Sequence, residues 1–233
     1  MAATAAIGTL GSAHYFDATT LAVGKANGLD GFRFYFLGRG GVLGDVEAGV
    51  VSSAFGYFNP ALVDKMWTSA KERVAPREAA RLYLAASHEL ARAKLAEADL
   101  AAFCEAAATI AEHIDPAGLA LYAGIAAEPQ PADVPARAYH LCNVIREGRG
   151  SAHLLAIRAV GLSPREAHQI KRPTELAAFG WESELELSDD HRQRWEQAEE
   201  LTDAMLEPAW ASIDEAGRQA VIDGLATMSA AYA

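Results

Sequence analysis

Ser163-Pro164-Arg165-Glu166 is the clearest helix start in the second half of the chain. Serine is a favoured N-cap residue, proline suits the first helical position, and a glutamate three residues after the cap completes a capping box. The helix that begins here is short, and we expect it to end near Lys171. Two predicted helices precede it, at about residues 136–147 and 152–160. These signals predict a helix-rich C-terminal half.

The segment Phe179-Gly-Trp-Glu-Ser-Glu-Leu-Glu-Leu187 follows the short helix. Its apolar residues Trp181, Leu185 and Leu187 alternate with acidic residues over part of its length, as they do in a strand or hairpin. A long helix is then expected over residues 188–210. The order of helix, helix, short helix, hairpin and long helix is that of a winged helix-turn-helix.

The expected fold is therefore mainly α, with a helical N-terminal half packed on a winged helix-turn-helix-like C-terminal half that has a small β-hairpin. The best linker candidate is Glu128-Pro-Gln-Pro-Ala-Asp-Val-Pro135, because it holds three prolines in eight residues. We expect a helical N-terminal domain over residues 1–127 and a winged-helix-like domain over residues 128–233. Hydrophobic residues make up 51% of the 233, which is enough for a sizeable core.

Several features that the sequence lacks narrow the class of protein. No apolar run reaches the roughly 20 residues that span a bilayer, and no positively charged segment precedes the apolar N-terminus, so neither a membrane span nor a secretory signal is expected. Two cysteines cannot form a disulfide framework or a four-cysteine zinc site, and a cytoplasmic location is the simplest interpretation. The seven histidines contain no His-Glu-x-x-His motif. We expect no metal site and no cofactor.

The distribution of charge argues against duplex DNA as a partner. The net charge is −11, and residues 174–207 hold eleven acidic residues against two arginines, so this segment carries −9 of it. The short helix offers Arg165, Lys171 and Arg172, but the predicted wing has three glutamates and no basic residue. Phosphate backbones repel such a surface. A winged helix that reads DNA needs basic residues on both its recognition helix and its wing.

Arg146, Arg149 and His153 follow one another at spacings of three and four residues. On a continuous helix these positions share one face. Two guanidiniums beside an imidazole suit an anionic group such as sulfate, phosphate or carboxylate, and the histidine can serve as a general acid or base. Glu147 completes this group as a binding candidate. The alternative is that these side chains form ion pairs between helices in the core.

Glu199 and Asp203 lie four residues apart on the predicted long helix. Paired carboxylates can serve acid–base chemistry. They can equally form ion pairs with Arg146 and Arg149, or belong to a solvated acidic face. All three interpretations stay open at this point.

The glycine-rich turn at residues 38–44 resembles a nucleotide-binding loop without being one. Leu43 stands where the G-x-G-x-x-G pattern needs its last glycine, and no Lys-Ser/Thr pair follows. An anion-binding turn that Arg39 assists, with Asp45 at its mouth, is one interpretation; a plain turn with Asp45 as an N-cap is the other. The aromatic residues nearby are more typical of a core than of a pocket, and among them Tyr57 is a candidate for substrate binding.

Five short motifs distributed along the chain point to a family resemblance. They are Tyr15-Phe16, Arg39-Gly-Gly-Val-Leu-Gly44, Phe55-Gly-Tyr-Phe58-Asn-Pro60, Arg146-Glu-Gly-Arg149-Gly-Ser-Ala-His153 and Glu199-Glu-Leu-Thr202-Asp203. In these the chain resembles a family of uncharacterised actinobacterial helix-turn-helix proteins, and the Arg-Glu-x-Arg-Gly-x-x-His motif is the most distinctive. The resemblance implies a winged-helix-like fold more than any one activity.

The residues predict a cofactor-independent, small-molecule enzyme of specialised metabolism that acts on an anionic substrate. Cyclisation, elimination, displacement and hydrolysis all fit. The alternatives are a winged-helix regulator that responds to a ligand and a non-catalytic partner subunit of a biosynthetic enzyme, and a homodimer stays open. Arg146, Arg149 and His153 are expected to meet Glu199 and Asp203 beside the turn at Arg39. The catalytic candidates are His153, Asp45, Glu199 and Asp203, and the substrate-binding candidates are Arg39, Arg146, Glu147, Arg149 and Tyr57.

Overall fold

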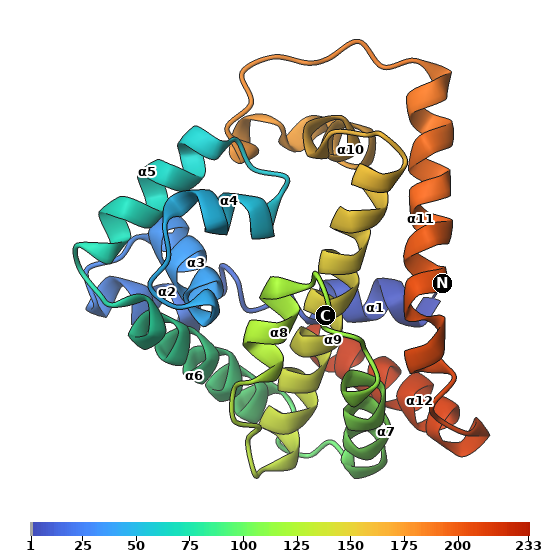
Figure 1. Ribbon diagram of the computed structural model, residues 1–233. Helices are drawn as coiled ribbons and strands as arrows, with labels where there is room; N and C mark the ends of the chain where they lie inside the picture. The colour runs from blue at the N-terminus through green and yellow to red at the C-terminus, as the bar shows by residue number, and fades with distance from the viewer. Residues whose placement is uncertain (1) are drawn as a thin grey trace.

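Helix α9 (Val134–Ala159) is the central element of the computed structural model, which describes residues 2–233. It begins at Asp133, whose carboxylate accepts a hydrogen bond from the Ala136 N–H. In Figure 1 it runs through the middle of the molecule, with α2 to α6 on its left and α11 on its right. Two separate helices were predicted here. They are one continuous helix, because Gly148 packs closely on Ile114 and Tyr122 without interrupting the hydrogen bonding.

The described residues form helices and contain no strand, so the prediction of a mainly α fold is confirmed. The other α-helices are α1 (Ala2–Leu10), α2 (Ala18–Ala26), α3 (Gly31–Gly40), α4 (Ala48–Phe55), α5 (Pro60–Lys71), α6 (Pro76–Lys94), α7 (Ala101–Glu112), α8 (Ala120–Ala126), α10 (Pro164–Lys171), α11 (Asp189–Trp210) and α12 (Glu215–Tyr232). Three short 3₁₀ helices span Gly41–Leu43, Pro173–Glu175 and Ala177–Phe179.

Helices α9 and α10 form a helix-turn-helix. Residues 160–163 connect them, and Gly161 adopts a positive φ of 82°, a conformation that glycine reaches without steric cost. The capping box predicted for α10 is present: the Glu166 N–H donates to Ser163 Oγ at 3.2 Å, and the Ser163 N–H donates to Glu166 Oε2 at 2.7 Å. The helix ends at Lys171 as predicted.

The predicted β-hairpin is wrong, and with it the wing. The segment after Gly180 forms no strand and instead crosses α10 as a single extended chain. Gln169 takes the place of a partner strand, because its Oε1 accepts from the Leu185 N–H at 2.7 Å and its Nε2 donates to the Leu185 carbonyl at 2.8 Å. Trp181 Nε1 donates to the Tyr57 carbonyl at 3.0 Å. The alternation of apolar and acidic residues therefore indicates an extended chain, not a paired one.

Apolar side chains gather in two large clusters. One holds α7, α9 and α12 together around Phe103 and Tyr139, and the other holds α3, α5 and α6 together around Phe36 and Trp67. Helix α9 also packs on α6, α8 and α11. The division into residues 1–127 and 128–233 stays a prediction. None of the helices in residues 2–233 is both long and apolar enough to cross a bilayer.

Candidate functional site

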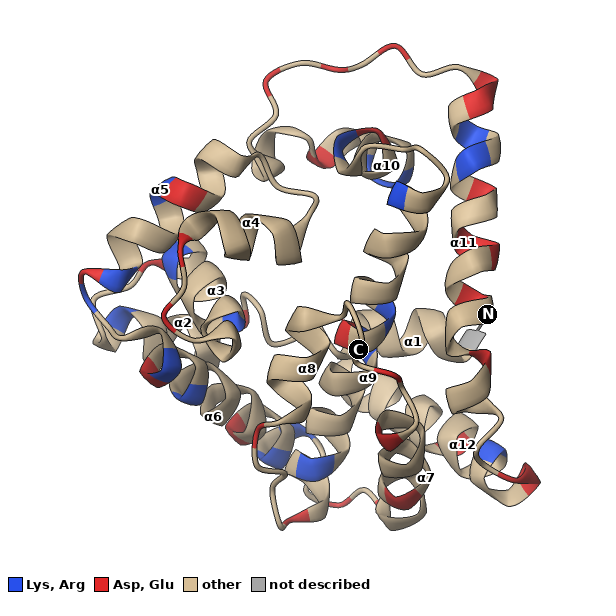
Figure 2. Cartoon of the chain, viewed as in Figure 1, with Lys and Arg blue, Asp and Glu red and all other residues tan. Residues whose placement is uncertain are grey.

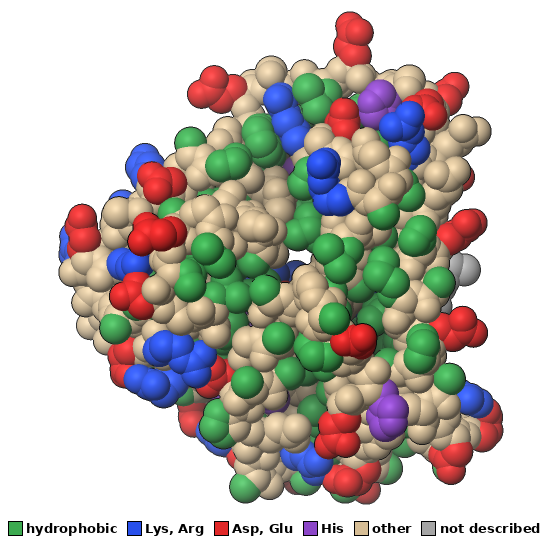
Figure 3. Space-filling view, viewed as in Figure 1, with side chains coloured by type: hydrophobic (Ala, Val, Ile, Leu, Met, Phe, Trp, Pro, Cys, Tyr) green, Lys and Arg blue, Asp and Glu red, His purple; other side chains and the backbone are tan. Residues whose placement is uncertain are grey.

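A large cavity lies between the side formed by residues 12–17, α3 and α4 and the face formed by α9, α10 and α11. Its volume is about 820 Å³, within the range of sites that hold drug-sized ligands. The space-filling view shows the surface hollowed near the centre of the molecule (Figure 3). Of the nine predicted site residues, the wall includes Arg39, Tyr57, Arg146, Glu147, Arg149, His153 and Glu199. The cavity also has aromatic walls, formed by Tyr15, Phe16, Phe32, Tyr35, Phe55, Phe58, Phe179 and Trp195.

Glu147 is the centre of a buried ionic group in this wall. Its carboxylate accepts from Arg39 Nε at 2.8 Å and Nη2 at 2.7 Å, from Arg146 Nη1 at 2.7 Å and from the Tyr15 hydroxyl at 3.0 Å. Burial alone would raise the pKa of Glu147, but the charges of Arg39 and Arg146 outweigh it and hold the pKa at about 2. The carboxylate is therefore ionised, and the three charged groups together carry +1.

The two arginines differ in how fully they are satisfied. Arg39 donates hydrogen bonds from Nε and from both terminal nitrogens to Glu147 and the Tyr35 hydroxyl. Its guanidinium also lies 4.4 Å from the centre of the Phe55 ring. Arg146 makes one side-chain hydrogen bond to the described residues, through Nη1, and its guanidinium lies 4.9 Å from the centre of the Tyr15 ring. Arg146 is therefore the member with donors left for another molecule.

His153 is a buried histidine farther along α9 in the same wall. Its Nδ1 lies 2.9 Å from Thr202 Oγ1, and the Thr202 hydroxyl donates its hydrogen to the Ala198 carbonyl at 2.6 Å. A hydroxyl has one hydrogen, so Thr202 must accept from His153, which places the proton on Nδ1 and leaves Nε2 with its lone pair. His153 Nε2 is buried and has no hydrogen-bond partner within the described residues.

Burial and the neighbouring charges together set the protonation of His153. Burial lowers its pKa from 6.5 to about 4, and Arg149 acts in the same direction while Glu199 opposes them. The nearest carboxylate oxygen, Glu199 Oε1, lies 3.9 Å from Nε2, just beyond hydrogen-bond distance. Arg149 Nη2 binds Glu199 Oε2 at 2.6 Å and lies 3.5 Å from Asp203. His153 is therefore neutral at pH 7, with an anion beside it.

The structure brings Arg149 and His153 to Glu199 and Asp203, but Arg146 turns to Glu147 instead. Asp203 is 61% exposed and lies outside the cavity wall. Asp45 lies outside it too: its side chain is 72% exposed and forms an ion pair with Lys71. It does not cap the following helix either, since α4 begins after Glu47.

Sequence reasoning missed two residues of this site, Thr202 and Lys171. Thr202, which fixes the proton on His153, was seen only as part of a motif. Lys171 was considered only as one of the basic residues that a DNA-reading helix would offer, yet it lines the cavity with its Nζ 5.7 Å from the centre of the Trp195 ring. Gly148 and Gly150 were expected either to let the backbone approach a ligand closely or to end the helix. Gly150 leaves the α9 backbone bare, since a Cβ there would meet no atom within 4 Å. The glycine itself was visible, but its open surroundings depend on the tertiary fold.

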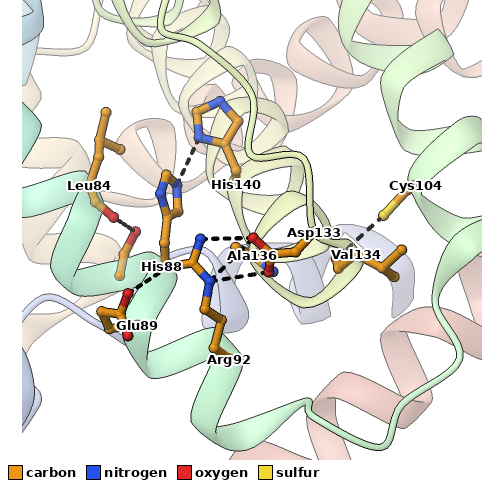
Figure 4. Close-up of polar contacts among 10 residues, drawn as sticks. Leu84, His88, Glu89, Arg92, Cys104, Asp133, Val134, Ala136 and His140 are labelled. Carbon is orange, nitrogen blue, oxygen red and sulfur yellow. Dashed lines mark hydrogen bonds and ion pairs between the residues drawn. The ribbon is translucent and has the colours of Figure 1, made fainter.

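A second polar cluster lies outside the cavity, between α6 and α9 (Figure 4). His88 Nε2 lies 3.3 Å from His140 Nδ1, and Arg92 Nη2 donates to Asp133 Oδ2 at 2.7 Å. Burial lowers the pKa of both histidines to about 4, and the Arg92 charge adds to this at His88. In residues 2–233 no three His, Cys, Asp or Glu side chains are grouped to hold a metal ion. This cluster joins two helices and is not part of the cavity.

The fold and the cavity define an all-helical protein in which a helix-turn-helix unit forms part of the wall of a ligand-sized site. A model of the Helix-turn-helix family matches residues 1–175, and the chain belongs to this family. No curated protein and no solved structure matches the chain. The matched residues include Arg39, Arg146, Glu147 and His153, whereas Glu199 and Thr202 on α11 lie beyond them.

Proposed function

We propose that this chain is a small-molecule enzyme that binds an anionic substrate in the cavity and removes a proton from it with His153. The observation that carries the proposal is the buried, unpartnered Nε2 of His153 in the wall of a ligand-sized cavity. An unpaired buried polar atom costs free energy, and a bound substrate that donates to it would recover that cost. That the motif from Arg146 to His153 is characteristic of the family stays a prediction. The actinobacterial origin stays a prediction as well.

The surroundings of His153 suit a general base. Thr202 fixes the proton on Nδ1, so the Nε2 lone pair can accept a proton from the substrate while the bonding electrons stay on the substrate atom. The imidazolium that forms is stabilised by Glu199. Arg146 holds the anionic group of the substrate in place. Proton removal of this kind can begin a cyclisation, a displacement or an elimination.

Carbethoxylation by diethyl pyrocarbonate tests the state of His153, because the reagent reacts with the lone pair of a neutral imidazole. Free N-acetylhistidine should react about tenfold more slowly at pH 5.5 than at pH 7.5, since its pKa is about 6.5. With a folded pKa of about 4, His153 should react at nearly equal rates at both values. Peptide mass spectrometry after labelling measures this, and His153→Gln identifies the peptide. A tenfold fall at His153, or no labelling there, would contradict the proposal.

A regulator that reads duplex DNA is the second candidate, because the chain has a helix-turn-helix. The second helix of such a unit normally enters the major groove. Here α10 is covered: Arg165 donates to the Ser183 carbonyl at 2.7 Å and lies 4.9 Å from the centre of the Trp181 ring. The segment after Gly180 covers α10, and acidic side chains lie along this segment and along α11 (Figure 2). We therefore favour the enzyme.

We expect the purified protein to give no sequence-specific shift of duplex DNA at physiological salt. Its acidic surface repels phosphates, and α10 cannot reach a groove without displacing the segment after Gly180. A gel-shift assay with the DNA upstream of its own gene, and a scrambled duplex of equal length as control, measures this. Nanomolar binding to the upstream DNA alone would reverse the order of the two candidates.

A further inference from the structure

Arg146 gives the cavity wall a positive charge that the protein does not neutralise. The carboxylate of Glu147 already receives two bonds from Arg39, one from Tyr15 and one from Arg146. Two guanidiniums against one carboxylate leave +1, and the Arg146 side chain is only 23% exposed. A buried charge is stable when a counter-ion and hydrogen bonds satisfy it. The wall at Arg146 therefore suits one anionic group of a ligand.

His153 sets a different requirement at its end of the cavity. Its Nε2 carries a lone pair, is buried and has no partner among the described residues. Such an atom accepts a hydrogen bond and cannot donate one. The ligand group that meets it must therefore carry a hydrogen, as a hydroxyl, a phenol or an amide N–H does.

The two ends are separated by a fixed length of α9. Arg146 and His153 are seven residues apart on one continuous helix, so their backbone positions are about 10 Å apart along the helix axis at 1.5 Å per residue. Between them Gly150 leaves the helix surface open. On the other side the cavity is lined by aromatic rings, among them Phe55 and Phe58. This space suits a flat apolar spacer.

We infer that the ligand is an elongated, largely aromatic monoanion that carries a hydrogen-bond donor about 10 Å from its anionic group. The anion binds Arg146, the spacer lies over Gly150 between the aromatic walls, and the donor meets His153 Nε2. The inference rests on the proposed function, since it takes His153 as the group that receives the substrate proton. It goes further by fixing the length and the two ends of the molecule.

Three matched probes test the length and the donor by isothermal titration calorimetry. 4′-Hydroxybiphenyl-4-carboxylate has a carboxylate and a phenol at about the required separation. Biphenyl-4-carboxylate lacks the donor, and 4-hydroxybenzoate lacks half of the spacer. We expect the first probe to bind about tenfold more tightly than either of the others, as one hydrogen bond or one buried ring would contribute. Equal affinity of the first two probes would overturn the donor requirement.

Variants assign each end of the probe to its residue. In His153→Phe the hydroxyl should no longer matter, so both biphenyl carboxylates should bind equally well. Arg146→Gln should weaken both by about tenfold or more while keeping the preference for the hydroxyl. Gly150→Leu should abolish probe binding by filling the space over α9. Gly150→Ala should bind the probe with an affinity closer to that of the natural protein. Circular dichroism checks that each variant is folded.

The outcomes separate this inference from the proposed function. If diethyl pyrocarbonate labels His153 at pH 5.5 but the probes show no dependence on hydroxyl, length or Gly150, the ligand inference fails and the enzyme proposal stands. If His153 is not labelled, the proposed function fails. Binding of the full-length probe that Gly150→Leu leaves unchanged would place the ligand elsewhere and overturn the inference directly.

Discussion

Replacing Glu147 by alanine should lower the free energy of unfolding by roughly 3–5 kcal/mol, the usual cost of removing one partner from a buried ionic group. Without its carboxylate, Arg39 and Arg146 would face each other in the wall with no anion between them. Arg39 is only 14% exposed, so solvent would compensate only in part for the lost partner. The Tyr15 hydroxyl would lose its acceptor as well.

Urea denaturation at pH 7 measures this change, and Glu199→Ala is the matched control. Glu199 also pairs with an arginine, at 2.6 Å, but its side chain is 31% exposed and Arg149 keeps Asp203 within 3.5 Å. Its loss should cost about 1 kcal/mol or less. Equal losses for the two variants would mean that Glu147 is not the anchor of this wall. Sequence reasoning placed Glu147 among the substrate-binding residues, and this stays a prediction; its contacts to Arg39, Arg146 and Tyr15 add a structural role.

The helix-turn-helix and one face of the site could be predicted from the sequence because they depend on local rules. The capping box at Ser163 needs only residues four apart or fewer, and the structure has it. The shared face of Arg146, Arg149 and His153 follows from the helical repeat, provided that the helix continues through Gly148 and Gly150. All three line the cavity.

The remaining features depend on contacts between distant parts of the chain. Apolar and acidic residues alternate after Gly180 as they do in a strand. Only the fold shows that the Gln169 side chain bonds the Leu185 N–H and carbonyl, the groups with which a partner strand would pair. Arg146 pairs with its neighbour Glu147, and α3 brings Arg39, more than 100 residues away in the sequence, to the same carboxylate. Asp45 follows a turn that looked like a site, yet that turn directs it to Lys71 and solvent.

As the pH falls, the protein should begin to lose stability at a pH well above the range in which carboxylates titrate. Burial lowers the pKa of His14 to about 3 and those of His88, His140 and His153 to about 4. In the unfolded chain a histidine has a pKa of about 6.5. Between pH 6.5 and 4 the unfolded state therefore binds more protons than the folded state, and stability is lost as the pH falls. Above pH 6.5 the contribution of these groups is fully present.

The expected loss is roughly 3–6 kcal/mol between pH 7 and pH 5, because each unit of pKa shift corresponds to about 1.4 kcal/mol and partial exposure of His88 reduces its share. Urea denaturation at half-unit steps of pH measures it, and this range stays above the usual pKa of carboxylates. The double exchange His88→Gln and His140→Gln should flatten the profile, since it removes two of the histidines whose pKa burial lowers and keeps polar side chains between α6 and α9. His113→Gln, at an exposed position, is the matched control.

A free energy of unfolding that is constant from pH 7 to pH 5 would show that these histidines are as well solvated in the folded protein as in the unfolded chain. That result would bear on the cavity as well as on the α6–α9 cluster. His153 has its pKa lowered by the same burial that leaves Nε2 unpartnered. If its share of the acid sensitivity is real, His153→Gln should flatten the profile further when it is added to the double exchange. The buried lone pair that we assign to substrate binding would then be measurable as a cost in stability before any substrate is known.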